Sequence, residues 1–161
     1  MSIRITGDWH KIARYLQAIW EDKTKPIALN RLASFYERQI KQNIKSGGAL
    51  TGKSFAPLAE STIRRKGSSK PLIDTGEMLN SIITEIIDDN TAFVGIKSGT
   101  RHSGGKEDTA QIAAVHEFGA LIPGGDVPAR PFIRPVLEDE KIRSEAEEIM
   151  KKAFDEEQGK L

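Results

Sequence analysis

Apolar residues recur at steps of three and four in three long stretches of the chain, and each stretch predicts an amphipathic helix. Residues 8–22 carry one apolar stripe, formed by Trp9, Ile12, Ala13, Leu16, Ile19 and Trp20. Residues 26–46 carry a second, formed by Ala28, Leu32, Phe35, Tyr36, Ile40 and Ile44. A third helix, over about residues 134–157, would bury Ile142, Ala146, Ile149, Met150 and Ala153.

A hairpin is predicted between the second and third of these helices. Residues 82–87 are apolar and rich in β-branched side chains, and residues 91–97 alternate between apolar and polar positions. The Asp-Asp-Asn sequence at residues 88–90 has the chemistry of a turn. The two strands should therefore pair antiparallel.

Shorter elements complete the pattern. Residues 58–67 predict one or two helical turns closed by a glycine, and residues 98–109 are polar and rich in glycine, which predicts a mobile loop. Residues 110–118 predict a short helix that ends at Gly119 and turns Ile112, Val115 and Phe118 inward. Residues 120–127 predict a strand and turn.

This order of elements predicts one domain over residues 1–161, of the α+β class, with its flexible loop at about residues 98–109. A small antiparallel sheet would be packed by the long helix of the N-terminal half and by the C-terminal helix. Asp74, with Thr75 and Gly76 after it, is predicted to cap a further helix start, because Glu77 stands at the capping-box position.

Composition indicates a soluble globular protein of cytoplasmic type. The 161 residues are 38% apolar and 29% charged, and none is cysteine. A disulfide framework and a thiolate zinc site are therefore excluded. The sequence also contains neither a signal peptide nor a membrane-spanning stretch.

The net charge of +1 conceals two halves of opposite sign. Residues 1–73 hold 14 Lys/Arg against 5 Asp/Glu, a balance of +9, and residues 74–161 hold 10 against 18, a balance of −8. The halves could attract each other within a subunit or between neighbours, or the basic half could meet DNA phosphates. Arg64, Arg65 and Lys66 form a basic cluster that would face DNA or a partner, although such clusters are commonly only solvated.

Candidate catalytic and metal chemistry is weak, so no catalytic residue, cofactor or metal is predicted. The glycine loop at residues 99–107 has the wrong spacing for a phosphate loop, with a glutamate at the hydroxyl position. The histidines at positions 10, 102 and 116 form no metal pair. His116 could act as a general base, but no nucleophile motif accompanies it, and a packed structural histidine is the favoured interpretation. The acidic residues at 88–89 and 138–140 are interpreted as a turn and a helix start rather than as a metal site.

Arg130 is the strongest candidate for a specific role. Pro128 and Pro131 stiffen the backbone on both sides of it, so its guanidinium could be aimed at a carboxylate in a bidentate pair. That carboxylate could belong to the same subunit or to the next one.

Four short motifs in order give the chain a family resemblance. They are Phe55-Ala56-Pro57-Leu58 with Ser61-Thr62-Ile63 and Lys66-Gly67, then Leu72-Ile73-Asp74-Thr75-Gly76 with Leu79 and Ser81-Ile82, then Ala113-Ala114-Val115-His116-Glu117-Phe118-Gly119, and finally Pro128-Ala129-Arg130-Pro131-Phe132. On these residues the chain resembles the phage virion morphogenesis family, which comprises tail-completion and head–tail joining proteins of tailed bacteriophages.

The resemblance implies a structural protein of the virion without enzymatic activity or cofactor, assembled in the host cytoplasm. Such proteins form a ring, most often of six copies, at the neck or upper tail, and contact other neck, connector and tail proteins. The resemblance assigns the positions that determine the fold or the subunit interface to Asp74, Thr75, Gly76, His116, Phe118, Gly119, Arg130 and Phe132.

Two other functions remain open on the sequence. A DNA-binding module would use the basic N-terminal half, and its binding would weaken steeply with salt. A small hydrolase would be centred on His116. If the protein is a ring around a DNA channel, the basic half could face that channel.

Overall fold

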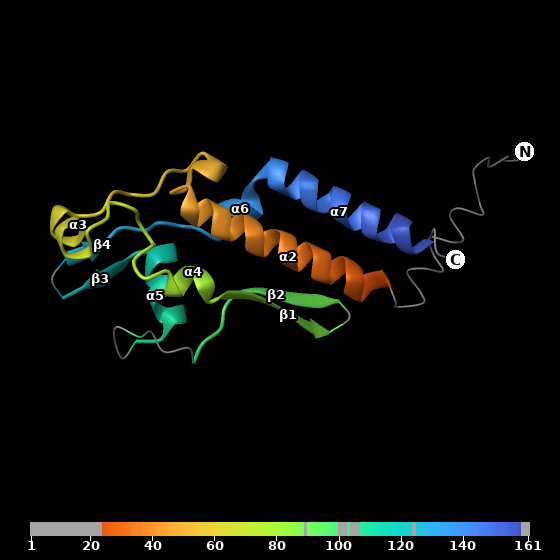
Figure 1. Ribbon diagram of the computed structural model, residues 1–161, viewed down its shortest axis with the longest axis horizontal. Coiled ribbons are helices and arrows are strands. Elements are labelled where there is room, and N and C mark those ends of the chain that lie inside the picture. The colour runs from red at the N-terminus through yellow and green to blue at the C-terminus, as the bar shows by residue number, and fades with distance from the viewer. Residues whose placement is uncertain (1–23, 89, 100–102, 104–106, 124, 159–161) are drawn as a thin grey trace, which may run out of the picture.

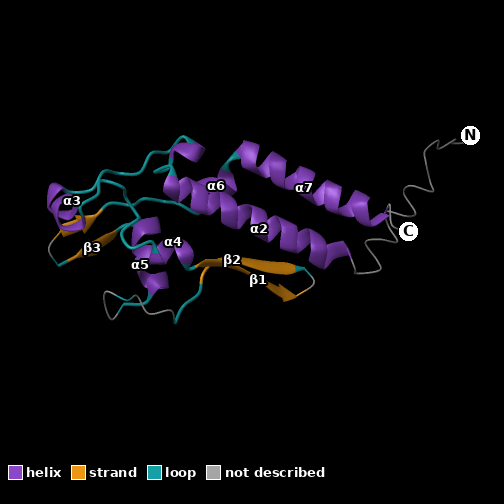
Figure 2. Ribbon diagram, in the orientation of Figure 1, coloured by secondary structure: helices purple, strands orange, loops and turns teal. Residues whose placement is uncertain are grey.

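The computed structural model describes residues 24–88, 90–99, 103, 107–123 and 125–158. The predicted helix over residues 8–22 lies outside the described residues. In the described part, the long helix α2 (Thr24–Lys45) lies between the helix α7 (Glu140–Gln158) and a hairpin made of β1 (Ile82–Asp88) and β2 (Thr91–Ile96), as Figures 1 and 2 show. This is the predicted α+β class, with both long helices packed as expected.

Helix α2 forms because its apolar residues fall on adjoining faces that have different partners, the hairpin and α7. Ala28, Phe35, Ile40 and Ile44 are buried, as the spacing predicts. The sequence pattern did not reveal Asn43, which is also fully buried and whose side-chain amide donates a hydrogen bond of 3.2 Å to the carbonyl of Phe132. That bond ties α2 to a segment 89 residues further along the chain.

The β1–β2 hairpin is antiparallel, as predicted, with Ile82 opposite Ile96 and an irregularity between Ile86 and Asp88. Asp88 accepts a hydrogen bond of 2.8 Å from the backbone N–H of Asn90, which is the turn chemistry that the sequence indicated. Ile82 is fully buried. The hairpin thus packs one apolar face against α2.

Several short elements follow the predicted positions closely. The turn η1 (Ala49–Thr51) and the helix α3 (Glu60–Lys66) fall in the long connector, and Gly67 closes α3 in the left-handed conformation with φ 69°. The helix α4 (Glu77–Asn80) is a single turn before β1. The helix α5 (Thr109–Phe118) leads into a second small hairpin of β3 (Ala120–Ile122) and β4 (Gly125–Val127).

The C-terminal helix differs from the prediction, because it is broken into α6 (Arg134–Glu138) and α7. Asp139 is extended, with ψ 121°, and its carboxylate accepts a hydrogen bond of 3.0 Å from the N–H of Ile142. Asp139 therefore acts as the N-cap of α7, where an uninterrupted helix was expected. Helix α7 buries Ile142, Ala146 and Ala153, but Met150 is exposed, contrary to the prediction.

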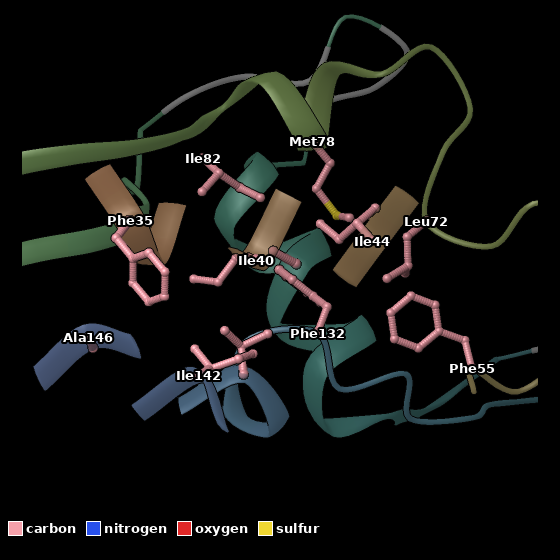
Figure 3. Packing of buried hydrophobic residues seen from close by; sticks show 12 residues of the cluster. Phe35, Ile40, Ile44, Phe55, Leu72, Met78, Ile82, Phe132, Ile142 and Ala146 are labelled. Atoms are coloured by element: carbon pink, nitrogen blue, oxygen red, sulfur yellow. The ribbon is translucent and has the colours of Figure 1, made fainter. Parts of the chain in front are cut away.

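The core lies where α2, β1, α6 and α7 meet the extended segment before α6. Figure 3 shows Ile40, Ile44 and Phe132 close together in the middle of this cluster. Phe132, Ile82 and Val136 have no exposed surface. The core therefore recruits residues from both halves of the chain.

Candidate functional site

Glu117 is a buried carboxylate whose hydrogen-bond donors, among the described residues, are backbone N–H groups. Its side chain, on α5, accepts hydrogen bonds from the N–H groups of Phe132, Ile133 and Arg134, at 2.8, 3.0 and 3.0 Å. The residue is only 6% exposed. Ile133 precedes α6 and provides no capping side chain, so the distant carboxylate satisfies the free N–H groups at the start of that helix.

Arg130 is a buried guanidinium that also binds backbone. It is 4% exposed, and it donates hydrogen bonds of 2.7 Å to the carbonyl of Ala56 and 2.9 Å to that of Pro57. The prediction that it pairs with a carboxylate of its own subunit is wrong for the described residues. Its fork instead holds two successive carbonyls of an extended segment, which a guanidinium can bind in parallel as it binds a carboxylate.

His116 precedes Glu117 on α5 and contacts the backbone of Arg130. Its carbonyl accepts a hydrogen bond of 2.6 Å from the N–H of Arg130, while its ring atom Nδ1 is buried without a hydrogen-bond partner in the described part of the chain. Burial lowers the pKa of the imidazole below its usual range, and the positive charges of Arg130 and Lys66 lower it further. The ring is therefore neutral near pH 7.

Phe118 is the last residue of α5, and Gly119 follows it as the C-cap. Phe118 is 70% exposed, so the prediction that it faces inward is wrong. Gly119 ends the helix as predicted, with φ 77°, and a side chain there would come within 3.1 Å of the backbone of Val127 and Ala129. Glycine at this position allows the close return of the chain after the β3–β4 hairpin.

Asp74 does not cap a helix, contrary to the prediction. The residue before α4 is Gly76, in the left-handed conformation with φ 85°, and no side chain caps the helix start there. Thr75 is closer to that role, because its hydroxyl accepts a long hydrogen bond of 3.4 Å from the N–H of Glu77. Gly76 therefore places the start of the helix two residues later than the capping-box pattern implies.

A pocket of about 280 Å³ with a mixed polar and apolar lining brings six of the predicted residues together. Its lining includes Asp74, Thr75 and Gly76, together with Arg65, Lys66 and His116. Burial lowers the pKa of Lys66, an effect that Asp74 opposes and the neighbouring cations reinforce. Arg64 lies outside this pocket and is exposed, with Glu60 at 3.6 Å.

A second concavity, of about 500 Å³, is far more apolar, and we call it the apolar groove. It lies between α5 and α6 beside the end of β2, and its lining is Ile96, Ala110, Ala113, Ala114, Phe118, Phe132, Ile133 and Leu137, with Glu117, Arg134 and Glu138. Phe118 and Leu137 are exposed, at 70% and 48%. Sequence patterns did not locate this groove, because it joins residues from three separate parts of the chain.

The sequence did contain one overlooked signal for Glu117. Ala113 and Glu117 are four residues apart on α5, and both are buried. A carboxylate on the buried face of a helix requires hydrogen-bond partners, so its position alone pointed to a structural bond.

The described residues contain no group of three or more His, Asp or Glu that could hold a metal ion. None of the helices in that part of the chain has the length and apolar character needed to cross a membrane. Loop residues 100–102 and 104–106 lie outside the described residues, but Asp108 after them accepts hydrogen bonds from Ser98 and from the N–H of Gly99. These bonds lower the pKa of Asp108, the Gly99 bond most.

The comparisons with known proteins agree with the motifs. The chain matches the model of the phage virion morphogenesis family over residues 7–155. The comparisons with curated proteins and with solved structures gave no match. Since the matched residues cover almost the whole chain and include both the Glu117 and the Arg130 motifs, the chain belongs to the phage virion morphogenesis family.

Proposed function

We propose that this protein is a structural component of a tailed phage or prophage virion. In this proposal it forms a ring at the neck or upper tail, completes the tail and joins it to the head connector. The observation that carries the proposal is the family match over residues 7–155, which gives the protein a role in virion morphogenesis. The ring and its position in the particle are proposed in addition to that role.

The surface of the protein supports assembly from identical copies. Leu121 and Phe118 are exposed at 85% and 70%, which is a large apolar exposure for side chains that serve no partner. The two halves of the sequence also carry opposite net charges. Different patches that attract each other favour head-to-tail contacts, which close into a ring when the rotation between copies permits it. We propose six copies.

We further propose that the protein acts without catalysis. The two buried charged groups, Glu117 and Arg130, are bound to backbone N–H and carbonyl groups of the same chain. Such bonds stabilise a fold, and they leave these groups engaged rather than available to a substrate. The neutral ring of His116 lies beside Arg130 and Lys66, two cations that would oppose its protonation by a substrate.

The expected partners are the proteins above and below the ring, together with DNA in the channel. Arg64 and Arg65 are exposed on α3, where they could face phosphates without sequence preference. Removing both charges in an Arg64→Ala, Arg65→Ala variant should reduce any DNA retention and its dependence on salt. A DNA-binding module would instead show strong, salt-sensitive binding by the isolated protein in a gel-shift assay.

The decisive experiment removes the protein from the phage or prophage that encodes it. Lysates would be examined by electron microscopy and plaque assay, with the wild-type gene supplied in trans as the control. We expect separate heads and tails without the protein, and joined particles with it. Fully joined, infectious particles made without the protein would overturn the proposed function.

A further inference from the structure

The apolar groove is the concave surface of the described chain best suited to receive a partner. Its floor is formed by Ala113, Phe132 and Ile133, and its rim by the exposed side chains of Phe118 and Leu137. A volume of about 500 Å³ is enough for several side chains. The groove is open, and no residue of β3 or β4 lines it.

The β3–β4 hairpin is packed only lightly against the other described elements. Each strand has three residues, and among the described elements the hairpin makes extensive contacts only within itself. Isolated two-stranded hairpins are marginally stable in water, so this one gains from a partner. Figure 1 shows it at the end of the molecule where α3 lies, whereas α6 packs against α2 and α7.

The outward face of the hairpin combines an apolar and an acidic side chain. Leu121 is paired with Asp126, and directly opposed residues of an antiparallel pair project from the same face. Both side chains are exposed, Leu121 at 85%, whereas Ala120 and Val127 on the other face are partly buried. The hairpin therefore directs a leucine and a carboxylate away from its own subunit.

The groove offers the complementary pair. Its lining is mainly apolar, and Arg134 at its edge has an exposed side chain that forms no ion pair with another described residue. The carboxylate of Glu138 at the same edge lies 3.7 Å from the ammonium of Lys53. Asp126 is likewise without an ion pair among the described residues. Leu121 is therefore complementary to the apolar lining of the groove, and the negative charge of Asp126 is complementary to the positive charge of Arg134.

We propose that the β3–β4 hairpin of one copy seats Leu121 in the apolar groove of the next copy, with Asp126 against Arg134. This inference rests on the proposed ring and identifies the contact that builds it. Hairpin and groove are different surfaces of one chain, so the contact is heterologous and each copy both gives and receives a hairpin. The partner is a second copy of this chain, in place of an unrelated tail protein.

Cross-linking tests the contact directly, because the natural chain has no cysteine. Leu121→Cys protein mixed with Ala114→Cys protein should give a cross-linked dimer with a short bis-maleimide, and neither should cross-link alone. The double variant should give a ladder that stops at the number of copies in the ring. Ser144→Cys, exposed on α7, replaces Ala114→Cys as the matched control and should give no cross-link to Leu121→Cys.

Charge reversal is a second test, directed at the proposed pair of Asp126 and Arg134. Asp126→Arg and Arg134→Asp should each raise the dissociation constant of self-association roughly tenfold in sedimentation analysis, since an unmatched charge at a contact is unfavourable. The two changes in one chain should restore it, because every contact would again join opposite charges. Leu121→Ser should weaken association by a similar factor without changing the circular dichroism of the monomer.

Three results would overturn the inference: a protein that stays monomeric at all concentrations, rings unaffected by Leu121→Ser, or cross-links absent from the mixed cysteine variants. Binding of another tail protein in the groove, with Leu121 free, would also overturn it. These results leave the proposed function standing if particles without the protein still fail to join. Joined particles without the protein would refute the function even if the cross-links form.

Discussion

Replacing Glu117 by alanine removes the acceptor for three backbone donors at once. The carboxylate receives bonds of 2.8, 3.0 and 3.0 Å from Phe132, Ile133 and Arg134. Hydrogen bonds to charged groups contribute about 1.5–3 kcal/mol each, but they are not additive, and water can reach part of the partly exposed end of this site. We therefore expect Glu117→Ala to lower the free energy of unfolding by about 3–5 kcal/mol.

Glu117→Gln keeps the shape of the side chain and removes its charge. It keeps one oxygen, which can serve the N–H groups of Phe132 and Ile133, but its amide nitrogen would face the N–H of Arg134 as a second donor. We expect a loss of about 1–3 kcal/mol, between wild type and alanine. Urea titrations followed by circular dichroism at one fixed protein concentration measure both variants, since association would otherwise shift the midpoints.

Glu148→Ala is the matched control, because Glu148 is exposed on α7 and its side chain forms no hydrogen bond or ion pair with a described residue. It should change stability by no more than about 0.5 kcal/mol. A Glu117→Ala variant that loses less than about 1 kcal/mol would refute the reasoning, because it would mean that the three donors find equally good partners without the carboxylate.

Three further predictions concern Arg130, Gly48 and His116. Arg130→Lys should cost about 2 kcal/mol in urea titration, because an ammonium cannot hold the two carbonyls with a rigid fork; stability equal to wild type would show that the fork is dispensable. Gly48→Ala should cost about 2–4 kcal/mol, since its side chain would clash with the carbonyl oxygen of Lys53, whereas Gly47→Ala, with open space around it, should cost only about 1 kcal/mol; equal losses would contradict this. The lowered pKa of His116 means that the folded protein binds its proton less readily than the unfolded chain, so this group contributes stability above its usual pKa of 6.5 that is lost as pH falls below that value. His116→Gln should flatten the dependence of the urea midpoint on pH in that window, and an unchanged slope would exclude the histidine as its source.

Periodic patterns predicted the elements that depend on one buried face. The spacing of Phe35, Ile40 and Ile44 predicted α2, and the apolar and turn residues from Ile82 onward predicted the β1–β2 hairpin. Both are packed along their length, so local sequence and tertiary contacts demand the same conformation. Neither conclusion required knowledge of distant residues.

The polar groups of the site could not be assigned in this way. Glu117 and Arg130 are bound to backbone groups, and a backbone N–H or carbonyl has no signature in the sequence. The sequence therefore predicted a carboxylate as the partner of Arg130, because a charged side chain can be identified in a sequence and a backbone carbonyl cannot. Asp139 was placed inside a helix for a similar reason, since its capping role depends on where α7 begins. Phe118 was expected inside because apolar residues usually are, but it borders an open groove.

The positions of these bonds connect fold and assembly. Arg130 fastens the segment before α6 to residues 56 and 57, and Glu117 fastens its last residues to α5. The same segment supplies Phe132 and Ile133 to the apolar groove. Loss of either charged group would therefore move the wall of the groove as well as weaken the fold.

A defect in assembly caused by Glu117→Ala would consequently say little about whether Glu117 touches a neighbour. Leu121→Ser is the cleaner change, because that side chain is 85% exposed and takes no part in the core cluster. If Leu121→Ser breaks the ring while the free energy of unfolding of the monomer is unchanged, the contact is made by the hairpin itself. If only the Glu117 and Arg130 variants break it, in proportion to their loss of stability, then the buried groups act on assembly through the fold and the contact lies elsewhere.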